Sequence, residues 1–127
     1  MPDLWPADMF PPTDGPHPII SVLREQAGHL GKRTNNQVEG QVDVKGVGEE
    51  FLLTFRLVVP GLQFYTYDLF SVLHPIGQFP AKFSFEDEEM KVVDAQGFVM
   101  KLGEILGAKR TVEIINSLLG MVRDVGR

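Results

Sequence analysis

The sequence predicts an α+β fold, a four-stranded antiparallel meander sheet with one N-terminal and two C-terminal helices in the order α-β-β-β-β-α-α. Seven of the nine phenylalanines lie between residues 51 and 85, where the only charged residues are Arg56, Asp68 and Lys82. Apolar residues recur at helical three- and four-residue steps on both sides of this block. We therefore expect an aromatic sheet whose inner face is covered by helices.

Length and composition limit the classes of function. The 127 residues contain no cysteine and carry a net charge of −5. We expect a proline-rich extended arm over 1–17 and a single α+β domain over 18–127. The lack of cysteine favours the cytoplasm. An acidic chain with no Lys/Arg run longer than a pair lacks the positive surface that nucleic acids and anionic membranes require, so we expect neither as a partner.

The arm contains most of the proline in the chain. Six of the nine prolines lie in the first eighteen residues, which is incompatible with a regular helix or a central strand. The arm also carries the apolar residues Leu4, Trp5, Met9 and Phe10. Because a fully solvated arm has little use for a tryptophan, we expect it to pack on the body of the protein or on a neighbouring subunit.

Three segments have the helical repeat. The first covers 18–31, and the second covers 95–106 with Asp94 as its N-cap. The third, about 111–125, has apolar residues over half of its circumference. A stripe of that width predicts contact with more than one neighbour.

Four strands are expected between the first two helices, over 38–45, 51–59, 64–74 and 79–86, and the acids at 86–89 are expected in a solvated loop. The loop lengths predict the strand register. On the inner face it pairs Val44 with Phe51, Val42 with Leu53, Gly40 with Phe55, Val59 with Tyr65, Leu57 with Tyr67 and Phe55 with Leu69. On the outer face it pairs Leu52 with Val72, Thr54 with Phe70, Arg56 with Asp68 and Val58 with Thr66.

No pattern predicts a catalytic, cofactor or metal site. Asp68, Ser71 and His74 follow the order of a catalytic triad, but strand alternation places Ser71 on the opposite face. His29 lies one helical turn after Glu25 and is expected to pair with it at the surface. The acids at 86–89 lack the spacing of a calcium loop. We expect no cofactor and no metal, and we favour a protein that is not an enzyme.

Three short segments carry a resemblance to other proteins. LREQA at 23–27, LGKRT at 30–34 and VEG at 38–40 resemble the opening of small uncharacterised bacterial proteins. Those proteins share a short arm with proline and tryptophan, a helix followed by a strand, and a helical C-terminus. The resemblance is clearest over residues 1–45 and covers the rest as a pattern. It implies no activity, so no functional residue is transferred.

The leading interpretation is a non-enzymatic interaction module that forms a homodimer or binds another protein through the outer sheet face. That face would otherwise leave an exposed apolar patch around the Arg56–Asp68 pair. A cover over the patch would make this pair a determinant of specificity, whereas without a cover it is an ordinary exposed cross-strand pair. The candidate interface residues are Leu52, Thr54, Arg56, Val58, Asp68, Phe70, Val72, Trp5 and Phe10.

Two alternatives remain open. In one, the sheet encloses a pocket for a small hydrophobic ligand or a substrate, and the protein is a carrier or an enzyme. The pocket would be lined by Phe55, Tyr65, Tyr67 and Phe83. In the other, Trp5 and Phe10 cover the outer face of their own chain, which leaves a monomer.

Overall fold

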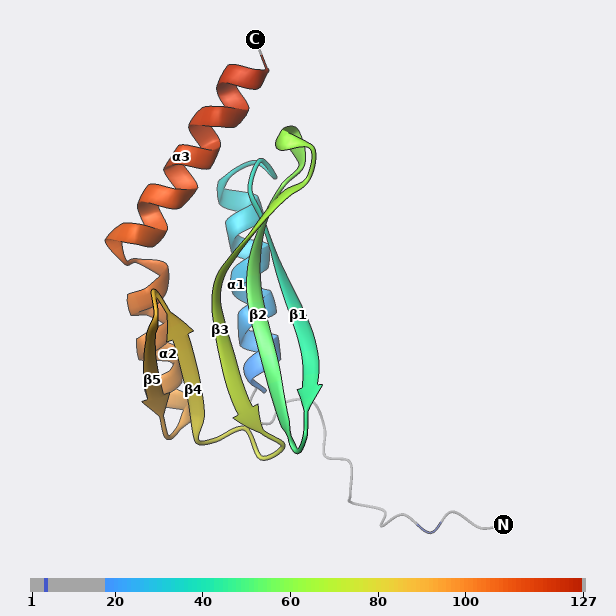
Figure 1. Cartoon of the computed structure of the whole chain (residues 1–127), viewed down its shortest axis with the longest axis vertical. Coiled ribbons are helices and arrows are strands. Elements are labelled where there is room, and N and C mark those ends of the chain that lie inside the picture. The colour runs from blue at the N-terminus through green and yellow to red at the C-terminus, as the bar shows by residue number, and fades with distance from the viewer. Residues whose placement is uncertain (1–3, 5–17, 127) are drawn as a thin grey trace.

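The computed structural model describes residue 4 and residues 18–126 (Figure 1). The prediction of an extended arm over 1–17 therefore falls, except for Leu4, outside the described residues. The helices are α1 (Ile19–Arg33), α2 (Ala95–Leu106) and α3 (Lys109–Val125), and a 3-10 helix, η1 (Pro60–Leu62), lies between the second and third strands. The strands are β1 (Glu39–Val47), β2 (Glu50–Val59), β3 (Tyr65–Pro75), β4 (Ala81–Phe85) and β5 (Glu88–Val92).

The predicted α+β class is confirmed, but the sheet has five strands and not four. It is open and antiparallel, with the order β1-β2-β3-β4-β5. The fifth strand replaces most of the expected acidic loop, because Glu86 and Asp87 alone form the turn, with φ angles of 52° and 65°. Two-residue turns of this type usually contain Asn-Gly or Asp-Gly, so Glu-Asp gives no signal for one.

The register between β2 and β3 is correct in one half and wrong in the other. Arg56 pairs with Asp68 as predicted, but Phe55 pairs with Phe70 and Leu53 with Val72. The pairing shifts at Phe55/Arg56, because Leu69 is an extra residue in β3 that forms a β-bulge. A shift of one residue reverses the faces. Phe70 and Val72 therefore lie on the inner face, where they are 4% and 0% exposed, and not on the outer face.

The register between β1 and β2 differs from the prediction by two residues. Val44 pairs with Leu53, and Val42 with Phe55. The turn consists of Gly48 and Glu49 alone, and Gly48 has the positive φ of 62° that glycine adopts readily. Because the side-chain period of a strand is two, this shift leaves every side chain on its predicted face.

The inner face holds the core, and α1 and α2 both lie against it (Figure 1). Phenylalanine rings from three strands and α2 follow one another in this layer. Phe55 stacks on Phe70 with ring centroids 5.1 Å apart, and Phe83 stacks on Phe98 at 5.0 Å. Phe70 and Phe83 are 6.0 Å apart and join the two pairs. This row of rings connects the middle of the sheet to α2.

The strand β4 is short and pairs with only part of β3. Its partners in β3 are Ser71, Val72 and Leu73. All five strands lie within the described residues, and in the segment 65–69 β3 pairs with β2 and with no strand on its other side. Helix α3 begins near this point and continues beyond the end of α2, where it passes η1 (Figure 1).

Helix α1 packs tightly on β1 at Gly40. A methyl group added to Gly40 would lie 2.7 Å from both Cα and Cβ of Ala27, and 3.1 Å from Cζ of Phe55. The first of these atoms belongs to the helix backbone, so it cannot move without the helix. The absence of a side chain at Gly40 therefore sets how closely α1 packs on β1.

We expect Gly40→Ala to lower the free energy of unfolding by about 1–3 kcal/mol, because the added methyl group pushes α1 away from β1. Gly46→Ala is the matched control, since Gly46 lies in the same strand and a methyl group there has no neighbour within 4 Å. Chemical denaturation of both variants measures the difference. Equal stability of the two variants would contradict this account of the α1–β1 contact.

Candidate functional site

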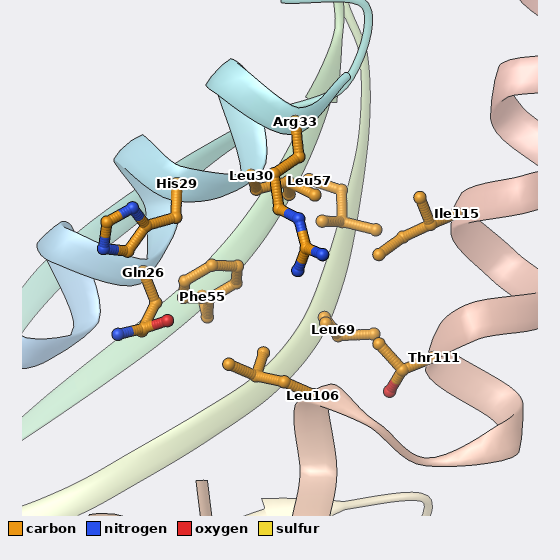
Figure 2. Close-up of a pocket in the computed structure, with 10 residues that line it drawn as sticks. All are labelled: Gln26, His29, Leu30, Arg33, Phe55, Leu57, Leu69, Leu106, Thr111 and Ile115. Atoms are coloured by element: carbon orange, nitrogen blue, oxygen red, sulfur yellow. The ribbon is translucent and has the colours of Figure 1, made fainter. Parts of the chain in front are cut away.

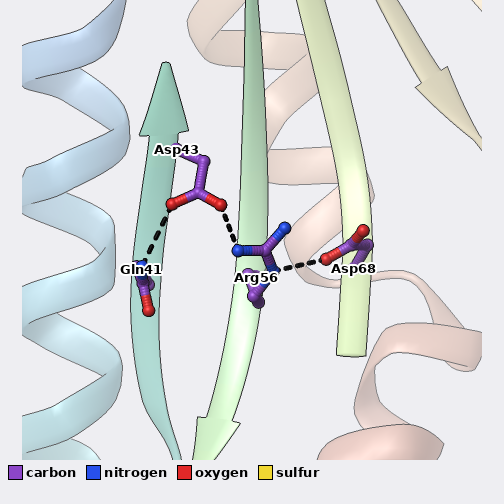
Figure 3. A network of polar contacts seen from close by, with 4 residues as sticks. All are labelled: Gln41, Asp43, Arg56 and Asp68. Carbon is purple, nitrogen blue, oxygen red and sulfur yellow. Dashed lines mark hydrogen bonds and ion pairs between the residues drawn. The ribbon is translucent and has the colours of Figure 1, made fainter. Parts of the chain in front are cut away.

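The outer face of the sheet carries an ion network centred on Arg56 (Figure 3). The Arg56 Nε donates to Asp68 Oδ1 at 2.6 Å, which confirms the predicted pair, and Arg56 Nη1 donates to Asp43 Oδ2. Gln41 Nε2 donates to the other oxygen of Asp43 at 3.0 Å. The hydrogen bond to Asp68 raises the pKa of Arg56 above its ordinary value, with a further contribution from Asp43. The network is open to solvent, because the Asp68 side chain is 62% exposed.

This face is less apolar than the sequence predicts. The β-bulge moves Phe70 and Val72 into the core, and Ser71 and Leu73 take their places on the outer face. In β2 and β3, which the structure describes in full, the apolar side chains that remain on this face are half-buried, namely those of Leu52, Val58 and Leu73. Thr54 is also half-buried there. Trp5 and Phe10, the other two candidate interface residues, lie outside the described residues.

The four residues predicted to line an aromatic pocket do not come together. Phe83 is fully buried and packs between Phe70 and Phe98. Phe55 lies in the floor of a pocket beside α1. Tyr65 and Tyr67 line a separate, open hollow between β3 and α3. The aromatic pocket of the sequence interpretation is therefore wrong as a single site.

A different pocket lies between α1 and α3, and it holds about 190 Å³ (Figure 2). Its floor consists of the apolar side chains of Phe55, Leu57 and Leu69 from the sheet and of Leu106 from the end of α2. One wall comes from α1 and the opposite wall from α3. The wall residues are Gln26, His29, Leu30 and Arg33 on α1, and Thr111 and Ile115 on α3.

Helical spacing explains both walls. The four α1 residues are three, four and seven positions apart, so they form one stripe along the helix. Thr111 and Ile115 are four positions apart, and Leu119 continues their stripe by another turn. Beyond the pocket this side of α3 faces a second, more open hollow lined by Thr34, Leu119, Val122 and Arg123, and Arg33 belongs to both. We call the pocket and this continuation the α1–α3 groove.

The buried side chain of Thr111 holds the turn between α2 and α3. Its Oγ1 donates to the carbonyl oxygen of Ile105 at 2.7 Å, and the side chain is completely buried. Only Gly107 and Ala108 separate the two helices. The hydrogen bond therefore fixes the direction in which α3 leaves α2, and with it the far wall of the pocket.

The rim of the groove is positively charged. Arg33 and Arg123 line it, His29 adds a third basic side chain, and no carboxylate belongs to the lining. Neither arginine forms an ion pair with another described residue. His29 Nε2 lies 3.7 Å from Glu25, as the sequence predicts. Figure 2 shows the guanidinium of Arg33 extending from α1 toward the space above the floor.

The pocket has the chemistry of a binding site for one apolar group. An apolar cavity of about 150 Å³ accommodates a benzene molecule, so a pocket of 190 Å³ has room for one aromatic ring. Apart from Thr111, whose hydroxyl is already bonded to Ile105, its polar groups lie on the α1 wall. Within the described residues no three His, Asp or Glu side chains converge as a metal site requires.

Sequence reasoning missed this pocket, although part of the signal was present. The wide apolar stripe of the last helix predicted more than one neighbour, and in the structure only Thr111 and Leu118 of α3 are buried. The remaining apolar residues of the stripe are half-buried or exposed. The last helix therefore has more apolar residues in its stripe than the structure buries, and this excess is the feature of the sequence that indicated the groove.

We expect Thr111→Val to lower the free energy of unfolding by about 1 kcal/mol, because it removes a buried hydrogen bond at nearly constant volume. Thr66→Val is the control, since Thr66 is exposed on β3 and such surface changes stay within about 0.5 kcal/mol. Urea denaturation compares the two variants. A Thr111→Val protein as stable as the control would show that this hydrogen bond does not hold the α2–α3 turn.

None of the helices within residues 18–126 combines the length and the apolarity that a membrane-spanning helix needs. The resemblance of residues 1–45 to small bacterial proteins stays a prediction. Comparison of the chain with known protein families, with curated proteins and with solved structures gave no match.

Proposed function

We propose that the protein is a non-enzymatic interaction module that binds a protein segment in the α1–α3 groove, with one apolar side chain of that segment in the pocket. The observation that carries this proposal is the combination of a ring-sized apolar pocket with a rim of arginines that have no ion-pair partner among the described residues. Apolar anchors inside a charged rim are typical of protein interfaces. The absence of cysteine favours the cytoplasm as the compartment.

The groove is a better candidate than the outer sheet face. The outer face has lost Phe70 and Val72 to the core, and its central charge, Arg56, is already neutralised by two carboxylates. Solvent-exposed ion pairs of this kind contribute little to binding or stability. The groove has the opposite properties, because its floor is apolar and its arginines lack carboxylates in the lining.

A protein segment is also a better occupant than a free small ligand. Pockets for small molecules usually hold about 300–1,000 Å³ and bury most of the ligand, whereas this pocket holds about 190 Å³ and shares Arg33 with the more open hollow beside it. An occupant that fills the pocket with one side chain and the groove with its backbone matches this shape. The same comparison argues against a small-molecule enzyme at this site.

Native mass spectrometry of the protein purified from its own host tests the proposal. We expect a complex that contains a second polypeptide, either another copy or a different protein, and no small-molecule adduct. Ile115→Glu, which places a charge in the pocket wall, is expected to remove the second polypeptide, and Val58→Asp on the outer face is expected to retain it. Thermal unfolding of both variants checks that each is folded.

Arg33→Glu provides a second groove variant in case Ile115→Glu fails to fold, because the Arg33 side chain is exposed. Detection of only the monomer, with no bound polypeptide, would overturn the proposal. So would a complex that Val58→Asp removes and the groove variants retain. An adduct of small-molecule mass would instead support the carrier alternative.

A further inference from the structure

We infer that the segment bound in the α1–α3 groove is the N-terminal arm of a second copy of this chain, with Trp5 in the pocket. The inference rests on the proposed function and names its partner. Three independent features support it: the charge of the arm, the size of its aromatic residue, and its attachment point on α1.

The charges of the arm and the groove are complementary. Residues 1–17 contain Asp3, Asp8 and Asp14 and no lysine or arginine. The groove contains Arg33 and Arg123 and no carboxylate in its lining. Complementary charge across an interface speeds association and sets the register of the two partners. A second copy therefore supplies both the acidic arm and the basic groove.

The size of the pocket matches an aromatic side chain. Trp5 is the single tryptophan of the chain and lies between Asp3 and Asp8 in the sequence. A tryptophan in the pocket places an acidic residue on either side of the anchor, and one of the two faces the end of the groove that carries Arg33 and Arg123. Tryptophan and arginine are the residues most often found at the energetic centre of interfaces.

The attachment point allows the arm to reach a groove. Pro18 lies thirteen positions after Trp5, and a proline-rich segment spans about 3.1 Å per position, or roughly 40 Å in total. The stretch of α1 from Ile19 to Arg33 rises only about 21 Å. Leu4, the neighbour of Trp5, is 80% exposed in the single chain. Since its own body does not cover this residue, we assign the arm to the groove of the second copy.

Two copies that exchange their arms form a closed two-fold dimer, because the same arm and the same groove are used twice. Each copy then fills the pocket of the other, and neither has a free groove for a third. The assembly therefore stops at two subunits.

Tryptophan fluorescence of the full chain tests the inference directly, since Trp5 is the single tryptophan and excitation at wavelengths that tyrosine does not absorb reports it alone. At high concentration we expect blue-shifted emission and a dimeric mass by light scattering. On dilution, the emission is expected to shift to the red with the same midpoint at which the mass halves. Blue-shifted emission from a protein whose mass is that of a monomer would place the arm in its own groove and overturn the exchange.

Charge reversal identifies the groove as the place where the arm binds. We expect Arg33→Glu to raise the dissociation constant of the dimer about tenfold or more, because it brings like charges together at the rim. Adding Asp8→Lys to this variant is expected to recover most of the affinity. Arg24→Glu is the matched control, as Arg24 lies on α1 but lines neither part of the groove.

Two further results would overturn the inference. The first leaves the proposed function intact, and the second removes the proposed function as well. In the first, Trp5 emission is red-shifted at all concentrations, and a different protein that copurifies with the chain is lost in the Arg33→Glu variant. The arm is then not the occupant, but the groove is still a binding site. If neither Arg33→Glu nor Ile115→Glu changes any association, the proposed function fails together with the inference.

Discussion

The row of four phenylalanine rings is the contact on which the rest of the structure depends. Phe55, Phe70, Phe83 and Phe98 come from β2, β3, β4 and α2, and their centroids are 5.0–6.0 Å apart. Stacked aromatic pairs contribute about 0.5–1.5 kcal/mol each beyond the area that they bury. Because only two residues separate α2 from α3, the row also determines where α3 begins, and so where the far wall of the groove lies.

The β-bulge at Leu69 makes this row of rings possible. It turns Phe70 toward Phe55 on the inner face while Asp68 stays opposite Arg56 on the outer face. Without the extra residue, one of these two contacts would be on the wrong side of the sheet. Both the core and the outer ion network thus depend on this one bulge. At the other side of the sheet, Gly40 leaves the room that α1 needs to pack on β1.

Much of the fold could be predicted from local patterns. Helix 95–106 and its cap at Asp94, whose side chain accepts from the backbone of Gly97 at 2.7 Å, follow from spacing and capping preferences. The β-bulge had a faint signal, since Leu69 and Phe70 are adjacent apolar residues in an alternating strand. The turn at Glu86 and Asp87 had none, because two-residue hairpin turns usually contain Asn-Gly or Asp-Gly and not Glu-Asp. The groove depends on the relative placement of α1 and α3, which periodicity alone does not contain.

The short pairing between β3 and β4 leaves a third edge within the sheet, in addition to those of β1 and β5. Over 65–69 the backbone of β3 has hydrogen-bonding groups that no strand satisfies, and such edges can recruit strands from other molecules. Helix α3 stands beside this edge, with Arg110 and Glu113 near Tyr65 and Tyr67. The charged side of α3 therefore blocks strands of other molecules from pairing with this edge, both sterically and electrostatically. A chain that ended before α3 would keep most of its core and yet be prone to aggregate along β3.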